Sequence, residues 1–257
     1  MPFEKIDAAK LSQEVTRQIE WLILQGVLRP GQRLPGERDL AARMGVSRPS
    51  LREALAAMQA DGLLVSRPNA GIFVAEVLGS AFSPALVRLI ARHPRAAGDF
   101  LRFRKDLEGL AAERAATEAG QADLDLLDRI VTDMRHAHAV ANPEAEAALD
   151  ADFHMAIVEA SHNIIALHMM RAMQDLLRQG MLFNRPRIFA RGDLRDRILD
   201  QHEAINAALQ ARDGPLARRT LESHLDCVAE ALEAQRKADE QDAIARLRLR
   251  NRPSDED

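Results

Sequence analysis

Hydrophobic positions recur with helical spacing along most of the chain. Residues 9–25 place five apolar side chains on one face and are closed by Gly26: Leu11, Val15, Ile19, Leu22 and Ile23. Residues 37–44 repeat the pattern for two turns and end at Gly45. A third segment follows Ser47, a favourable N-cap, carries Pro49 in its first turn and continues to about Ala60. The pattern predicts three helices, with a tight turn between the last two.

The spacing changes after Gly62. Residues 63–66 and 72–75 are strand-like, and residues 67–71 between them have the composition of a turn. Two helices joined by a tight turn and followed by a two-stranded hairpin are typical of a winged helix-turn-helix. In that motif the second helix of the pair reads DNA. We expect the first predicted helix to complete the core of this domain.

From Pro84 the pattern is helical almost to the end of the chain, without strand signals. Breaks at glycine, asparagine and proline separate seven predicted helices: 84–92, 95–118, 121–140, 143–160, 163–183, 193–211 and 214 to about 245. Helices joined by such short connections pack as an antiparallel bundle. The predicted fold class is therefore mostly α. A winged helix-turn-helix occupies residues 1–78, an all-α bundle residues 79–245 and a disordered tail residues 246–257, with a linker at residues 76–83.

Composition supports this fold and bears on binding partners and on the cellular location of the protein. Aromatic residues make up only 4% and tyrosine is absent, as suits a helical protein. The net charge of −4 disfavours nucleic acid, but residues 29–67 hold seven arginines against four acidic residues. Cys227 is the single cysteine, so no intrachain disulfide can form. We find no signal peptide and no apolar run of membrane-spanning length, which predicts a cytoplasmic protein with no membrane partner.

The second helix of the predicted motif carries candidate DNA-binding residues. Arg48 and Arg52 stand one turn apart, with Ser47 and Ser50 beside them. Guanidinium and hydroxyl groups at a helix N-terminus suit phosphates and base edges. Two arginines alone would more often form a solvated charged face, but their place before a wing favours DNA. Because one recognition helix reads few bases, we expect a homodimer on double-stranded operator DNA.

Four side chains of the predicted bundle can converge on one metal ion. Asp150 and His154 are one turn apart at the edge of an apolar helix face. His202 and His224 lie at nearly equal distances from the turn at residues 213–215, so antiparallel helices bring them to the same height. Three imidazoles and a carboxylate suit Zn²⁺, Ni²⁺, Mn²⁺ or Fe²⁺. Each histidine alone would more often be an ordinary core or surface residue, whereas the four together favour a divalent metal site.

Two sets of sequence motifs, one in each predicted domain, resemble those of known bacterial regulators. RPGQRLPGERDLAARMGVSRPSLREAL, followed by a wing ending in FV, resembles the winged helix-turn-helix of the GntR family. DADFHMAIVEASHN, QHEAINAAL and ESHLDCV resemble the FCD effector-binding bundle of its FadR-like subfamily. The first resemblance implies a set of DNA contacts: Arg38, Ser47, Arg48, Pro49, Ser50, Arg52 and Arg67. The second implies the metal ligands Asp150, His154, His202 and His224.

The FCD resemblance also implies a small-molecule effector. FRKDLEGLAAERAA resembles the first long helix of that bundle, where Arg104 would bind a carboxylate of the effector. Without the resemblance, an ordinary surface arginine is the simpler interpretation. Asn163 matches a position that lines the pocket. The expected effector is a small hydroxy- or keto-acid of the pyruvate, lactate, glycolate or citrate class.

The sequence therefore predicts a transcription repressor that a carboxylate, bound at a metal site, releases from its operator. Two alternatives stay open: a DNA-binding protein with a purely structural metal, and a metalloenzyme whose helix-turn-helix is incidental. A metalloenzyme needs an open metal position and a general base. Glu203 adjoins His202 but is expected to point to a different face. We therefore expect no enzymatic activity.

Overall fold

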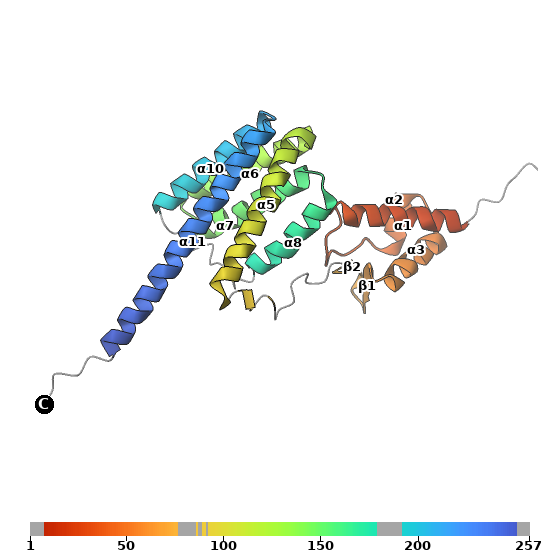
Figure 1. The fold of residues 1–257 in the computed structure, drawn as a ribbon. Helices are drawn as coiled ribbons and strands as arrows, with labels where there is room; N and C mark the ends of the chain where they lie inside the picture. Colours follow the sequence, from red (N-terminus) through yellow and green to blue (C-terminus); the bar gives the residue numbers. More distant parts are fainter. Residues whose placement is uncertain (1–7, 77–85, 87–88, 91, 179–191, 251–257) are drawn as a thin grey trace, which may run out of the picture. The chain divides into compact units, whose positions relative to one another are not determined.

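A computed structural model describes residues 8–76, 86, 89–90, 92–178 and 192–250 of the 257-residue chain. The chain divides into two compact units, Met1–Ala81 and Phe82–Asp257 (Figure 1). In the described ranges, no helix combines the length and the apolar character that crossing a membrane requires.

The first unit is a winged helix-turn-helix, as predicted. It contains α1 (Ala8–Leu24), α2 (Glu37–Met44) and α3 (Arg48–Ala60), followed by β1 (Leu64–Arg67) and β2 (Gly71–Val74). The two strands are antiparallel, with Leu64 opposite Val74 and Arg67 opposite Gly71. Both of the first pair are buried, together with the apolar faces of α1 and α3, so the hairpin closes the core of this unit.

Local signals fix the turn between α2 and α3. Gly45 ends α2 in the left-handed conformation, with φ 66° and ψ 28°, which glycine adopts without steric cost. Ser47 then caps α3, because its Oγ accepts a hydrogen bond of 3.2 Å from the backbone N–H of Ser50. The recognition helix therefore begins at a defined residue, Arg48.

Replacing Ser47 with alanine should lower the free energy of unfolding of this unit by about 1 kcal/mol, because one N–H of the first turn loses its acceptor. Urea unfolding can be followed by the fluorescence of Trp21, the single tryptophan, which lies in α1. Ser66→Ala, at an exposed position of β1, is the control and should change stability by less than about 0.5 kcal/mol. Equal effects of the two substitutions would contradict the capping role.

The second unit is a helical bundle. It contains α5 (Pro94–Glu118), α6 (Gln121–Ala139), α7 (Pro143–Ala160), α8 (Ile164–Arg178), α10 (Gly192–Gln210) and α11 (Gly214–Arg250). Helix α11 runs beside α5 (Figure 1), and small residues permit their close approach. A Cβ at Gly214 would lie only 2.9 Å from the carbonyl oxygen of Glu113. Phe153, Ile205 and Leu221 are fully buried and hold α7, α10 and α11 around one core.

The structure differs from the sequence prediction at the end of the chain. The sequence predicts a disordered tail at residues 246–257, whereas α11 continues through Arg250. Ion pairs one turn apart support this extension, among them Arg246 with Asp242 at 2.7 Å. Residues 251–257 lie outside the described residues, as do the linker after Glu76, most of the predicted helix 84–92, and residues 179–183 of the helix predicted at 163–183.

Candidate functional site

The predicted DNA-binding residues lie mostly on the surface of the winged unit. Six of the seven are exposed: Arg38, Ser47, Arg48, Pro49, Arg52 and Arg67. A groove of about 530 Å³ between α3 and the hairpin is lined by residues that include Arg52 and Arg67. The guanidinium carbon of Arg67 stands 4.4 Å from the ring centre of Phe73, which holds this arginine against the hairpin. Recognition helix and wing thus present positive charge around one groove.

Ser50 is the exception among these seven residues. Its side chain is buried, with 5% exposure, and its hydroxyl lies 2.9 Å from the Oγ of Ser47. Ser50 therefore packs beside the N-cap of α3, with the three-residue spacing of an N-cap contact, and its contact with DNA stays a prediction.

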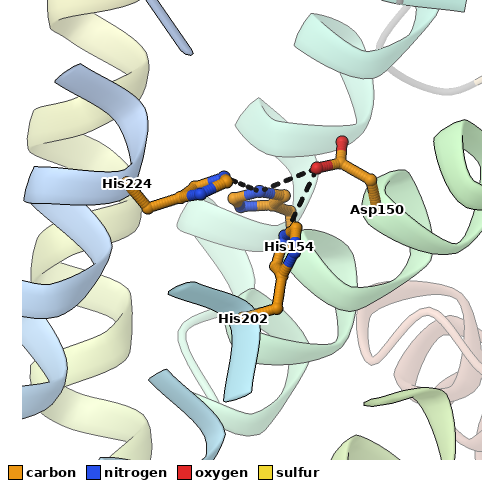
Figure 2. A group of neighbouring side chains, drawn as sticks. All are labelled: Asp150, His154, His202 and His224. Carbon is orange, nitrogen blue, oxygen red and sulfur yellow. Dashed lines mark hydrogen bonds and ion pairs between the residues drawn. The ribbon is translucent and has the colours of Figure 1, made fainter. Parts of the chain in front are cut away.

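The four predicted metal ligands come together inside the helical unit (Figure 2). Asp150 and His154 extend from α7, His202 from α10 and His224 from α11, and all four are buried. One potential ligand atom of each lies within 4.8 Å of the other three. The Asp150 Oδ1 is 3.3 Å from Nε2 of His202 and 3.6 Å from Nε2 of His154. The Nε2 atoms of His154 and His224 are 3.2 Å apart.

Each imidazole is also held from outside the cluster. Nδ1 of His154 lies 2.5 Å from Glu108 Oε2, and Nδ1 of His224 lies 3.1 Å from the amide oxygen of Gln201. The His202 ring bonds the backbone of Ile198, one turn earlier. A ring that donates through Nδ1 presents its lone pair at Nε2, and Nε2 of His202 is buried with the Asp150 carboxylate oxygen, at 3.3 Å, as its neighbour. Several inward-facing lone pairs beside a carboxylate fit a divalent cation.

Burial favours, for two of the three rings, the neutral form that binds a metal. Burial lowers the pKa of His202, and burial together with the neighbouring His202 and His154 rings lowers the pKa of His224 well below its ordinary value. Burial is the largest single effect on His154 and opposes its charged form, but the Glu108 and Asp150 carboxylates together outweigh it and raise the pKa of this ring. For Glu108, burial opposes ionisation, yet Arg104 and His154 lower its pKa to about 2.

Arg104 is part of the same buried group of side chains. It is only 3% exposed, so the interpretation as a surface arginine is wrong. Its Nε donates a hydrogen bond to Glu108, whereas its Nη2 is buried without a hydrogen-bond partner. Glu108 is not among the residues predicted to have a role. A signal for one exists, because Glu108 shares the buried stripe of α5 with Ala111, Ala112 and Ala115, where a carboxylate needs a specific partner.

Two other predicted positions lie at the surface. The Oδ1 of Asn163 accepts hydrogen bonds of 3.1 Å from the backbone N–H groups of Ile165 and Ala166, and the residue is exposed. This geometry gives Asn163 a capping role at the start of α8, and its expected pocket-lining role stays a prediction. Glu203 forms an ion pair of 2.5 Å with Arg135 on the exposed side of α10, so it points away from the cluster as expected.

Comparisons with known proteins match one family model to each of the two structural units. The model of the bacterial regulatory proteins of the gntR family matches residues 11–74, and the FCD domain model matches residues 99–227. The protein assigned as regulator of the L-lactate dehydrogenase operon in Escherichia coli K12 is 34% identical, over 85% of each chain. The Glc operon transcriptional activator of the same strain is 32% identical, over 89% of this chain and 91% of its own.

A further relative and a solved structure complete the comparison. The transcriptional repressor NanR of Escherichia coli is 31% identical over 86% of this chain and 83% of its own. A GntR structure from Streptococcus agalactiae superposes with a TM-score of 0.53 at 22% identity, covering 86% of this chain and 99% of that one, and so supports the fold. The chain belongs to the GntR family of bacterial transcription regulators and carries the FCD domain of its FadR-like members.

Proposed function

We propose that this transcription regulator senses a small carboxylate at a divalent metal site in its helical unit. One observation carries the proposal: Nε2 atoms of histidines and a carboxylate oxygen of Asp150 converge in a buried cluster, with the rings held from outside. Zn²⁺, Ni²⁺, Mn²⁺ and Fe²⁺ all accept such a donor set. A bound ion would supply positive charge that attracts and orients an anion.

Arg104 supplies the second recognition element in this proposal. Its buried Nη2 lacks an acceptor, and a guanidinium prefers a planar carboxylate partner. This arginine also lies beside the cluster, because Glu108 accepts a hydrogen bond from Arg104 Nε through one oxygen and contacts His154 Nδ1 through the other. An effector carboxylate bound at Arg104 would therefore stand close to the metal ligands.

The effector class follows from this chemistry and from the relatives. A 2-hydroxy- or 2-keto-acid offers a carboxylate for Arg104 and a second oxygen for the cation. The relative assigned to the L-lactate dehydrogenase operon supports such an acid. The candidates are pyruvate, lactate, glycolate and citrate. Relatives include a repressor and an activator, and we propose that this protein is a repressor released by its effector.

The proposed target is operator DNA with two-fold symmetry, bound by a homodimer. Arg48 and Arg52 on α3 would contact base edges and phosphates in the major groove, and Arg38 on α2 would contact the backbone beside them. Arg67 would contact the DNA from the hairpin. The effector can change this binding only if it has different affinities for the DNA-bound and the released arrangements of the protein.

A purely structural metal is the second candidate role for the cluster. All four ligand side chains are buried, as in closed structural sites in which the protein fills every coordination position. In that case the metal would stabilise the bundle without admitting an acid. This alternative predicts DNA binding that is indifferent to carboxylates.

Fluorescence anisotropy on the upstream DNA of the protein's own gene separates these roles. Pyruvate, lactate, glycolate and citrate are titrated into the complex of protein and DNA, with and without prior chelation of metal. We expect one acid to weaken DNA binding by about 5- to 150-fold, the usual range of allosteric coupling, and chelation to abolish the response. DNA binding that no acid disturbs, in a protein that retains metal, would support the structural role instead.

A further inference from the structure

Glu108 occupies an unusual place between the two halves of the proposed site. It lies on α5, is almost fully buried, and both of its carboxylate oxygens are used. Oε1 accepts a hydrogen bond from Nε of Arg104. Oε2 stands 2.5 Å from Nδ1 of His154, whose Nε2 faces Asp150 and His224. One side chain thus contacts both the proposed effector-binding arginine and a proposed metal ligand.

The two contacts have distinct geometric consequences. The bond to Nδ1 fixes the orientation of the His154 ring and leaves the Nε2 lone pair directed into the cluster. The bond to Nε of Arg104 holds the guanidinium on one edge, while Nη2 is left without an acceptor. The two donors approach different oxygens of one planar group, and an amide, which has one acceptor oxygen, cannot place an acceptor at both positions.

We infer that Glu108 is a positioning residue that links effector binding at Arg104 to metal binding at His154. The inference rests on the proposed function and adds a residue and a route of coupling to it. A carboxylate acid that binds Arg104 acts through Glu108 on the orientation of His154, and a metal that binds His154 acts in the reverse direction. Because coupling between binding sites is reciprocal, each ligand then raises or lowers the affinity of the other by the same factor.

The first test replaces Glu108 with glutamine and measures Zn²⁺ affinity by competition with a fluorescent chelator. Glutamine keeps the volume but offers one acceptor oxygen to two donors, Arg104 and His154. We expect Zn²⁺ affinity to fall 10- to 100-fold, as for other outer partners of metal-bound histidines. The visible absorption spectrum of the Co²⁺-loaded protein should change as well, because the orientation of one ligand changes.

Glu146→Gln is the matched control. Glu146 is also a buried glutamate, and it pairs with Arg195 at 2.6 Å. The histidine that it contacts is His138, which is not one of the proposed metal ligands. We expect Glu146→Gln to leave Zn²⁺ affinity and the Co²⁺ spectrum unchanged within about threefold. A similar loss in both variants would show that any buried glutamate–arginine pair matters for folding, and it would overturn the positioning role.

A double variant tests the competition between the two donors directly. In Arg104→Met/Glu108→Gln, the amide oxygen can accept from His154 alone. Removing the positive charge of Arg104 together with the negative charge of Glu108 restores the charge balance. Zn²⁺ affinity should return to within about tenfold of the wild type, whereas DNA binding should no longer respond to lactate or pyruvate because Arg104 is absent. Zn²⁺ affinity no better than in Glu108→Gln alone would overturn the inference.

The wild type distinguishes the failure of this inference from the failure of the proposed function. If the wild type binds Zn²⁺ tightly and Glu108→Gln binds it equally well, the linking role is wrong and the metal site stands. If the wild type binds no Zn²⁺, Co²⁺, Ni²⁺, Mn²⁺ or Fe²⁺, the metal site and the linking role are both wrong.

Discussion

Replacing Arg48 with alanine is expected to abolish selective operator binding while the fold is retained. Arg48 is exposed at the first residue of α3, so the substitution leaves the core intact. A bidentate contact from arginine to guanine contributes about 1–3 kcal/mol of discrimination. The proposed homodimer would make this contact twice, so we expect a loss of about 2–6 kcal/mol, from roughly 30-fold to more than 10,000-fold in affinity. Anisotropy on operator DNA and on scrambled DNA measures the loss.

Arg17→Ala provides the matched control for charge. Arg17 is exposed on α1 and pairs with Glu14 at 3.1 Å. It carries the same charge in the same unit, but it lies outside the helix-turn-helix pair. This variant should bind the operator with nearly wild-type affinity and show, at most, a small change in salt dependence. If Arg48→Ala and Arg17→Ala weaken operator and scrambled DNA alike, Arg48 contributes only non-specific charge.

Replacing His224 with alanine is expected to remove the stabilisation of the protein by metal. At a free metal concentration 100 times the Kd, binding stabilises the native state by about 2.7 kcal/mol. For a helical unit of this size, that corresponds to a rise in Tm of about 5–11 °C. Without His224 the cluster keeps Asp150, His154 and His202, and we expect no rise at the same metal concentration. Thermal unfolding with and without Zn²⁺, followed by circular dichroism, measures the difference.

The metal-induced shift in Tm is the decisive quantity because His224 is buried and its loss also leaves a cavity. Comparing each variant with and without metal separates the two effects. His136→Ala, which removes an exposed imidazole from α6, should keep the full metal-induced rise. A rise of several degrees in His224→Ala would show that the ion binds elsewhere.

Much of the fold could be predicted because its signals are local. Gly45, Ser47 and Pro49 mark the turn and the start of α3, and each acts within a few residues of its own position. Equal spacing from the turn at residues 213–215 was enough to align His202 with His224. The exposure of Ser50 was not predictable in this way. From the sequence alone, the Ser50 hydroxyl could point to solvent or to Ser47, and residue spacing does not decide between them.

The unpredicted parts depend on contacts between distant segments. The alanine stripe of α5 indicates that Glu108 is buried, but only the packing of His154, 46 residues later, shows what its carboxylate contacts. The length of α11 depends on whether its charged residues pair at helical spacing, which composition alone does not show. Charged residues near the C-terminus suggest disorder, yet ion pairs at helical spacing, such as Arg246 with Asp242, favour continued helix.

The distribution of the four proposed ligands over α7, α10 and α11 has a consequence for local unfolding. His154 and His224 are 70 residues apart in the chain, and a single ion bound to both would act as a reversible crosslink between distant segments. Opening any one of the three helices would then break the coordination of the other two. On metal binding, backbone amides in α7, α10 and α11 would become protected from hydrogen exchange together. Occupancy of one small site would then be measured as the cooperative opening of three helices.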